Sequence, residues 1–478
     1  MQTGAFPKVF IRFKAQIAKR CCADKSNKPV QYSKYALKLK LLLVVILSVM
    51  IVVSPLIHFA FAEKPATFSK PKNLSKDEGF SEFPRIAASG KDVYLVWVGD
   101  GNNGWATYFK RSNNYGASFK PTVVLTEQNK SYFYPKVEAS GDNVYLAWLT
   151  ANAEAADPLA ITFKASHNHG KTFDPTIDLW NRPPVEPGNF TDPASSTNPP
   201  ELAADDENVY VAWQNAWNIY IRASHDNGNL FEETQHLVSY HFEDGEVGEE
   251  QVGGISIAAS GADVYVVWNG RLSGDIFLKA SQDGGDTFGP TITLSNNSPP
   301  NFSEAPQAIA RGANLYVTWV TFGYQSSANF IASTDEGIHF NEPIILGGIQ
   351  PSSVSFPRLA ADGENVYAVW GGLNEAFFRT SHDRGETFDQ SLNLNEEDGF
   401  VYFPQIVAQD GFVYASWLVE HSFETNDVFV RISQDGGDSF GAPITALDDV
   451  HDFELVFAVF AKQIYVAVGG LEVTFAHS

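Results

Sequence analysis

Cysteine is nearly absent from this chain: Cys21 and Cys22 are the only two in 478 residues. No disulfide can therefore stabilise the long stretch that follows them, so core packing has to hold it together. The adjacent pair is either lipidated or reactive, or it is an incidental reduced pair.

Positive charge is scarce and unevenly placed. The chain holds 33 Lys and Arg against 56 Asp and Glu, for a net charge of −23. The first 40 residues contain ten of the basic residues and one acid, Asp24, so the remaining residues carry −32. A body that acidic repels phosphate backbones, which argues against nucleic acid as a partner.

One stretch has no charge at all. Residues 41–62 contain no Asp, Glu, Lys or Arg, and 22 such residues are enough to cross a bilayer as a helix. The basic residues 1–40 are then expected to stay cytoplasmic, with residues 63–478 outside the cell. Because residues 60–62 read Ala-Phe-Ala, a form typical of signal-peptidase sites, the segment is either a retained signal anchor or a cleaved signal peptide. The exported part is accordingly membrane-anchored or secreted.

Helical periodicity is absent after position 62. Apolar and β-branched runs of five to seven residues, separated by Ser-Gly, Asp-Gly or Asp-Asn, predict strands joined by tight turns. One unit, FPRIAASGKDVYLVW at 83–97, is the first of eight similar units along the chain. Their tyrosines are Tyr94, Tyr145, Tyr210, Tyr265, Tyr316, Tyr367, Tyr414 and Tyr465, each followed three residues later by Trp except in the last, where Val468 stands.

A second pattern, S-x-D/N-x-G-x-x-F, occurs seven times at spacings of 48 to 58 residues. It begins at Ser112, Ser166, Ser224, Ser281, Ser333, Ser381 and Ser433. The Ser hydroxyl and the Asp carboxylate can bind nearby backbone amides, the Gly can adopt positive φ, and the Phe returns the chain to a core. Each copy therefore predicts a tight turn that closes a hairpin, and we call these segments box turns.

The box turns resemble the Asp-box, or BNR repeat, of the sialidase superfamily and other β-propellers. The resemblance covers nearly all of residues 63–478 and implies an all-β propeller with four antiparallel strands in each blade. Residues 471–478 are similar to a third strand, and residues 67–75 are similar to the end of a box followed by a fourth strand. We therefore predict eight blades in one monomeric domain, the last shared between the two ends of this region. Seven blades is the alternative.

In sialidases, three arginines bind the substrate carboxylate at the propeller axis, a Tyr paired with a Glu is the nucleophile, and an Asp is the general acid/base. Here the position nine residues before each repeat tyrosine is expected on the innermost strand. It is occupied by Arg85, Lys136, Glu201, Ser256, Gln307, Arg358, Gln405 and Val456. These residues are either a substrate-binding mouth or satisfied rim residues. The F-R-I-P signature of sialidases is absent, and Tyr324 is a nucleophile candidate by loop position alone.

Two long loops, 181–200 and 239–254, are expected on the side of the ring opposite the box turns, where long loops often carry function. Carboxylates gather on this side, and the candidates for a metal site are Glu243, Asp244, Glu246, Glu396, Glu397 and Asp398. Clustered loop carboxylates suit Ca²⁺, and a solvated surface is the alternative. No other cofactor is expected. Three box histidines, His167, His225 and His382, are expected to be exposed turn residues.

The repeat motifs predict the propeller clearly, whereas no set of residues in this sequence matches a catalytic motif. The sequence therefore predicts a non-enzymatic platform outside the cell that binds glycans or proteins. The alternative is a glycoside hydrolase of the exo-α-sialidase type, with Arg85, Lys136 and Arg358 at the substrate carboxylate.

Overall fold

The computed structural model describes residues 67–76, 80–100, 105–126, 130–152, 158–181, 199–215, 218–238, 252–298, 300–323, 326–348, 356–422, 425–451, 454–470 and 472–478. Residues Thr67–Ser478 form one compact unit. The predicted membrane segment 41–62 and Tyr324 lie outside the described residues. Within those residues, no helix has the length and apolar character needed to span a bilayer.

The described residues form 32 strands in eight four-stranded antiparallel sheets, each of which is one blade. Blades 1 to 4 consist of β2 (Ser81–Ser89), β3 (Asp92–Gly99), β4 (Ala106–Ser112) and β5 (Val123–Val124); β6 (Lys130–Ser140), β7 (Asn143–Asn152), β8 (Pro158–Ser166) and β9 (Ile177–Asn181); β10 (Glu201–Asp205), β11 (Asn208–Asn215), β12 (Asn218–Ser224) and β13 (Gln235–Val238); and β14 (Val252–Ser260), β15 (Asp263–Gly270), β16 (Ile276–Ser281) and β17 (Ile292–Thr293).

Blades 5 to 8 repeat the same order. They consist of β18 (Phe302–Arg311), β19 (Asn314–Phe322), β20 (Ser327–Ser333) and β21 (Ile344–Gly348); β22 (Arg358–Asp362), β23 (Asn365–Gly371), β24 (Ala376–Ser381) and β25 (Leu392–Asn393); β26 (Phe400–Gln409), β27 (Phe412–Ser422), β28 (Thr425–Ser433) and β29 (Ile444–Val450); and β30 (Glu454–Phe460), β31 (Gln463–Gly469), β32 (Thr474–His477) and β1 (Lys72–Asn73). The all-β, eight-bladed propeller predicted from the sequence is confirmed.

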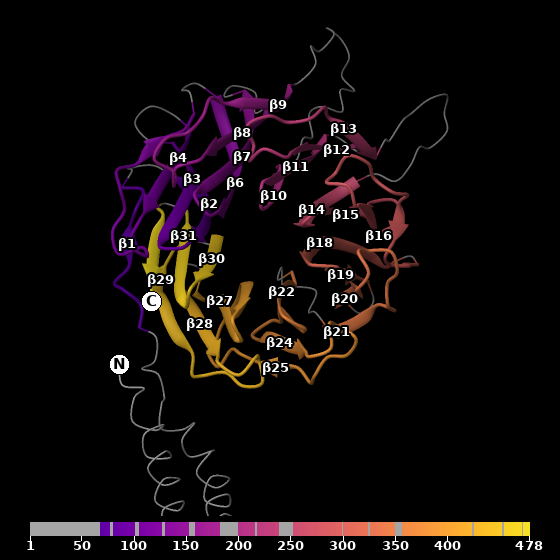
Figure 1. Ribbon diagram of the computed structural model, residues 1–478. Coiled ribbons are helices and arrows are strands. Elements are labelled where there is room, and N and C mark those ends of the chain that lie inside the picture. The colour runs from indigo at the N-terminus through magenta and orange to yellow at the C-terminus, as the bar shows by residue number, and fades with distance from the viewer. Residues whose placement is uncertain are drawn as a thin grey trace, which may run out of the picture. The chain divides into compact units, whose positions relative to one another are not determined.

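Blade 8 closes the ring. Its outer strand β1 comes from the start of the unit and pairs antiparallel with β32 from the end, with Lys72 opposite Phe475. The Leu74 amide donates to the Val473 carbonyl at 2.8 Å, which extends the pairing. Figure 1 shows the indigo β1 beside the yellow C-terminal strands. The predicted split blade is thereby confirmed.

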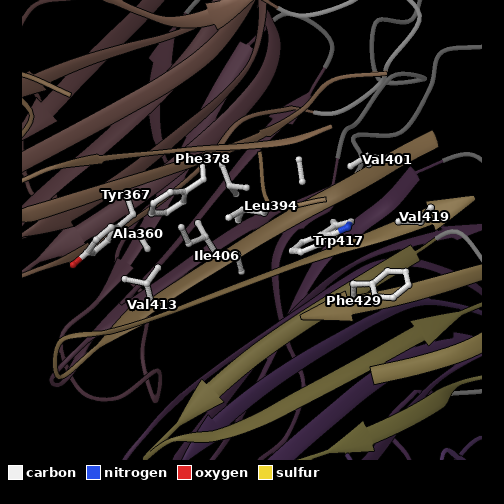
Figure 2. Packing of buried hydrophobic residues seen from close by; sticks show 13 residues of the cluster. Ala360, Tyr367, Phe378, Leu394, Val401, Ile406, Val413, Trp417, Val419 and Phe429 are labelled. Atoms are coloured by element: carbon white, nitrogen blue, oxygen red, sulfur yellow. The ribbon is translucent and has the colours of Figure 1, made fainter. Parts of the chain in front are cut away.

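The core lies between neighbouring blades rather than at the axis of the ring. The second strand of each blade is almost wholly buried, and its Tyr and Trp are among the largest fully buried side chains. In the cluster of Figure 2, Tyr367 and Phe378 of blade 6 pack with Ile406 and Trp417 of blade 7. Each blade therefore buries both of its faces, which accounts for apolar residues on both sides of its strands.

The box turns have the chemistry that the sequence predicts. In blade 6, the Ser381 hydroxyl donates to Asp383 Oδ1 at 2.7 Å and accepts the Gly385 amide at 2.8 Å. Gly385 has φ +86°. The turn also reaches the preceding blade, because Phe388 packs edge-on against Phe330 with ring centroids 4.9 Å apart. A box turn therefore joins two blades as well as closing its own hairpin.

Candidate functional site

The candidate ring residues lie on the first strand of each blade, the strand nearest the axis. Figure 1 shows β10, β14, β18 and β22 around the centre of the ring. Each of the eight residues pairs with the residue two positions after its repeat tyrosine, as with Arg85 opposite Val96 and Arg358 opposite Val369. The shared register places them at one level of the ring, as the sequence pattern predicts.

Four of the eight ring residues connect neighbouring blades. Lys136 of blade 2 donates to both carboxylate oxygens of Glu201 in blade 3, at 2.8 and 2.9 Å. Ser256 Oγ accepts the Ala308 amide at 3.1 Å. Gln307 Oε1 accepts the Leu359 amide at 2.8 Å. All four polar side chains therefore have partners within the protein, and the partner of Lys136 is Glu201.

Arg85 and Arg358 differ from the other ring residues. Burial lowers the pKa of Arg358, the Glu201 carboxylate opposes that change, and the charge of Arg85 adds to it. Residues from blades 1, 3 and 6 therefore act on one another electrostatically. Arg85 Nη1 donates to the Pro84 carbonyl at 2.7 Å. Among the described residues, neither arginine forms an ion pair, so both guanidinium groups keep donors for an anion.

Strained aromatic residues lie beside this ring. Phe83 and Tyr134 have φ of +55° and +52° and lie at register shifts in β2 and β6. Their ring centroids are 4.2 Å apart. Positive φ is costly for bulky residues. The equivalent residues Ala305 and Phe403 have φ of +52° and +49° at the same register shift, so this conformation belongs to the repeat. The Phe83 amide donates to Glu454 Oε2 of blade 8 at 2.6 Å, which joins the two blades here.

The aromatic pair lies on the side of the ring opposite the box turns. Strand β2 begins at Ser81 and ends at the turn containing Lys91. The box residue Tyr115 donates its amide to the Lys91 carbonyl at 2.9 Å, so the box turns are at the far end of the strand. We call the region formed by Phe83, Tyr134, Arg85 and Arg358 the mouth. The sequence pattern did not predict the aromatic pair, because Phe83 and Tyr134 come from different blades.

Glu138 is a second residue that the sequence analysis missed. It lies in β6 opposite Tyr145, two residues beyond Lys136. Burial within the ring raises the pKa of its carboxyl to about 7, while Lys136 lowers it and Glu201 raises it. By its accessible surface Glu138 is an exposed residue, so the burial that shifts its pKa reflects the protein atoms around the inner strand, and water still reaches the carboxyl. A signal was available, because the same position in the other blades is apolar: Ala87, Ala203, Ala258, Ile309, Ala360, Val407 and Ala458.

Replacing Glu138 with Gln is expected to change how stability depends on pH. The folded pKa of about 7 exceeds the ordinary value of 4.5, so the native state binds more protons between these two pH values. The unfolding free energy of the wild type therefore falls as pH rises through this window. Glu138→Gln should match the wild type near pH 4.5 and be more stable at pH 8. Thermal melts across pH 4.5–8 test this, and parallel curves for the two proteins would contradict it.

The proposed Ca²⁺ ligands are only partly described. Glu243, Asp244 and Glu246 lie outside the described residues. Glu396 Oε1 forms an ion pair with Arg431 Nη2 at 2.6 Å, and the Asp398 backbone carbonyl accepts from His421 Nδ1 at 2.9 Å. In the described residues, the group of His, Asp and Glu side chains close enough to hold a metal ion lies elsewhere, at His225.

Comparisons with known proteins give structural similarity only. No family model and no curated relative matches the sequence. An ulvan lyase of family PL25 has 11% identity and a TM-score of 0.45, covering 84% of this chain and 94% of that chain. The NanB sialidase from Streptococcus pneumoniae has 10% identity and a TM-score of 0.36, covering 84% and 69%. Trypanosoma rangeli sialidase has 12% identity and a TM-score of 0.34, covering 59% and 54%. At these values the similarities carry no argument about activity.

Proposed function

We propose that the propeller is a binding module for carboxylate-bearing glycans, presented outside the cell through segment 41–62 or after its cleavage. The mouth is the proposed binding surface. The observation that supports this most is the pair of arginines, Arg85 and Arg358, on the same inner ring of strands as the aromatic pair Phe83 and Tyr134.

The chemistry of the mouth suits an acidic sugar. A guanidinium presents a planar fork of donors that matches a carboxylate, and partial burial strengthens the attraction. Aromatic faces offer apolar area to the C–H face of a pyranose ring, and Tyr134 is 37% exposed. Because Lys136 is bound to Glu201, the ligand carboxylate would receive two cationic groups rather than the three expected from the sialidase resemblance.

The charge of the whole unit narrows the ligand class further. The chain beyond residue 40 carries −32, and such a field repels densely charged polyanions at long range. A glycan with isolated carboxylates is repelled less strongly and can still reach the arginines. The proposed ligand is therefore a sparsely charged uronate or sialate oligosaccharide rather than a heavily sulfated one.

Binding of matched oligosaccharides to residues 63–478 tests this function. The wild type should bind an acidic oligosaccharide and bind its carboxyl-reduced counterpart at least tenfold more weakly. Arg85→Ala and Arg358→Ala should each weaken acid binding by about 10- to 100-fold, the value of a charged hydrogen-bonded pair. Arg311→Ala is the control, because Arg311 lies at the box end of β18 and pairs with Asp362 at 3.2 Å. Equal binding of the two oligosaccharides would refute the proposal.

A glycoside hydrolase is the second candidate, and Glu138 is the observation that favours it. Glycosidases use two carboxyl groups whose surroundings separate their pKa values. Glu138 with a pKa of about 7 would be the acid, and Glu201, which accepts from Lys136, the second carboxyl group. Fluorogenic sialoside and uronide substrates test this. Turnover by the wild type that is lost in Glu138→Gln, with binding retained, would favour the hydrolase over the binding module.

A further inference from the structure

A cluster of potential metal ligands lies between blades 3 and 4 on the box-turn side of the ring. His225 and Glu232 come from the box turn of blade 3, and Asp286 comes from that of blade 4. Their ligand atoms all lie within 4.8 Å of one another. His225 Nε2 is 3.8 Å from Asp286 Oδ1. The cluster is at the surface and at the opposite end of the inner strands from the mouth.

The proton on His225 is fixed by a neighbour outside the cluster. Asn208 Nδ2 donates to the Gly261 carbonyl of blade 4, which turns Asn208 Oδ1 towards His225 Nδ1 at 2.7 Å. An amide oxygen only accepts, so Nδ1 carries the proton and the neutral ring has its lone pair on Nε2. In that tautomer Nε2 can bind a cation held jointly with the two carboxylates, whereas a protonated Nε2 would instead form an ion pair with Asp286. Metal-binding histidines commonly have this second hydrogen bond.

The same arrangement recurs between blades 6 and 7. His382 Nδ1 lies 3.1 Å from Asn365 Oδ1. Its Nε2 lies 3.4 Å from Asp389 Oδ2 of the same blade and 3.3 Å from Asp438 Oδ1 of the next. Histidine, the acid after the box Phe and the Asp of the following box therefore occupy equivalent positions at two blade junctions.

The box turn that follows each of these two histidines along the chain has a sequence that the other boxes lack. The two boxes that read Asp-Gly-Gly-Asp are those after the His225 and His382 boxes. A Cβ on Gly284 would lie 3.0 Å from His225 Cε1, so glycine leaves room for the ring. Asp-Gly-Gly-Asp is by itself a common turn sequence. Its placement beside a box histidine at both junctions gives the second aspartate a separate role.

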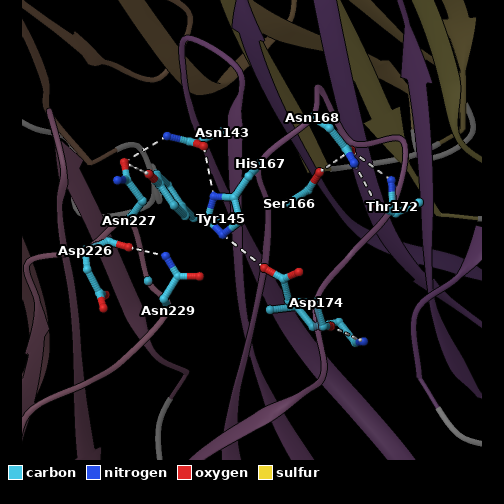
Figure 3. A network of polar contacts seen from close by, with 12 residues as sticks. Asn143, Tyr145, Ser166, His167, Asn168, Thr172, Asp174, Asp226, Asn227 and Asn229 are labelled. Carbon is cyan, nitrogen blue, oxygen red and sulfur yellow. Dashed lines mark hydrogen bonds and ion pairs between the residues drawn. The ribbon is translucent and has the colours of Figure 1, made fainter.

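The junction between blades 2 and 3 lacks one of the three ligands. Figure 3 shows His167 between Asn143 and Asp174, with Asn229 of the next box where the other junctions have aspartate. His167 Nε2 lies 3.0 Å from Asp174 Oδ2. This junction keeps the histidine, its Asn partner and one carboxylate, and it provides a matched control.

We propose that His225, Glu232 and Asp286 bind a divalent transition-metal ion of the zinc class, which links blades 3 and 4. One imidazole and two carboxylates suit Zn²⁺ better than Ca²⁺, which takes six to eight oxygen ligands. Ligand atoms around tetrahedral Zn²⁺ are roughly 3.3 Å apart, so the surface side chains would have to close by up to about 1.5 Å. The fourth position is open to water. At the other junction His382 lies near Asp389 and Asp438, but among the described residues only the His225 group has all of its ligand atoms within 4.8 Å of one another.

Calorimetric titration of residues 63–478 with Zn²⁺ at pH 7.5, in the presence of excess Ca²⁺, tests the site. The wild type should bind Zn²⁺ saturably, and Asp286→Asn should lose one equivalent. Asp174→Asn, at the junction with the missing ligand, should leave the stoichiometry unchanged. Zn²⁺ should also raise the melting temperature of the wild type more than that of Asp286→Asn. Asn208→Ala should weaken the affinity of this site by about 10- to 100-fold.

Two results would overturn the proposal. The first is the absence of saturable Zn²⁺ binding, with His225 observed by NMR as an imidazolium that forms an ordinary ion pair. The second is an unchanged stoichiometry in Asp286→Asn, which would place the ion elsewhere. Neither result bears on glycan binding, because the mouth lies at the other end of the inner strands.

Discussion

A chain that begins at Lys76 is expected to melt many degrees below one that begins at Glu63, or to aggregate. The shorter chain loses β1 and with it the outer edge of blade 8. It also loses Leu74, which is 6% exposed, and Phe68, which packs against the core between blades 7 and 8. Removing one buried large apolar side chain typically costs about 3–5 kcal/mol, a large part of a domain's net stability of about 5–15 kcal/mol.

The unpaired edge of β32 adds a second effect. An exposed strand edge is a template for pairing with another molecule, so the shorter chain should also associate on heating. Calorimetry and light scattering of the two chains provide the measurement. The chain from Glu63 is the control, since it retains every described residue. Equal melting temperatures would show that the ring does not depend on β1 for its closure.

Gly385→Ala is expected to destabilise the protein far more than Gly363→Ala. Both glycines are in blade 6 and have positive φ, +86° and +63°, so both substitutions carry a backbone cost of about 1–2 kcal/mol. A Cβ at Gly385 would lie 2.6 Å from Phe330 Cζ of blade 5, whereas nothing lies within 4 Å of one at Gly363. Overpacking of this kind adds about 1–3 kcal/mol.

Urea unfolding of the two variants measures the difference directly. The midpoint for Gly385→Ala should fall well below that for Gly363→Ala, which in turn lies slightly below the wild type. A double variant with Phe330→Leu should recover part of the loss, because the smaller side chain relieves the contact. Equal midpoints for the two single variants would mean that the tight contact between Gly385 and Phe330 of the preceding blade does not contribute to stability.

The blade count and the box-turn chemistry could be predicted from the sequence because both are local. The spacing between Ser381 and Gly385 determines which hydroxyl meets which amide within one turn. The repeat of Tyr367 and Trp370 identifies the second strand wherever it occurs. The register of the inner strands follows from the same repeat, which is why Arg85 and Arg358 were correctly placed at one level.

The parts that could not be predicted depend on contacts between blades. The pattern Phe-Pro gives no indication that Phe83 contacts Tyr134 of blade 2 and Glu454 of blade 8. The binding of Lys136 to Glu201 likewise needs two blades side by side. The sequence of its own box turn predicts His225 only as a turn residue, because Asp286 comes from the neighbouring blade. The repeat therefore predicts the structure within one blade but not the side-chain contacts between neighbouring blades.

The most direct test of the proposed function is a crystal structure of residues 63–478 with an acidic oligosaccharide that binds in solution. The account predicts the sugar carboxylate within hydrogen-bonding distance of Arg358 or Arg85, and a pyranose ring against Tyr134 or Phe83. A sugar bound on the box-turn side or on the outer strands, with the mouth unoccupied, would contradict it.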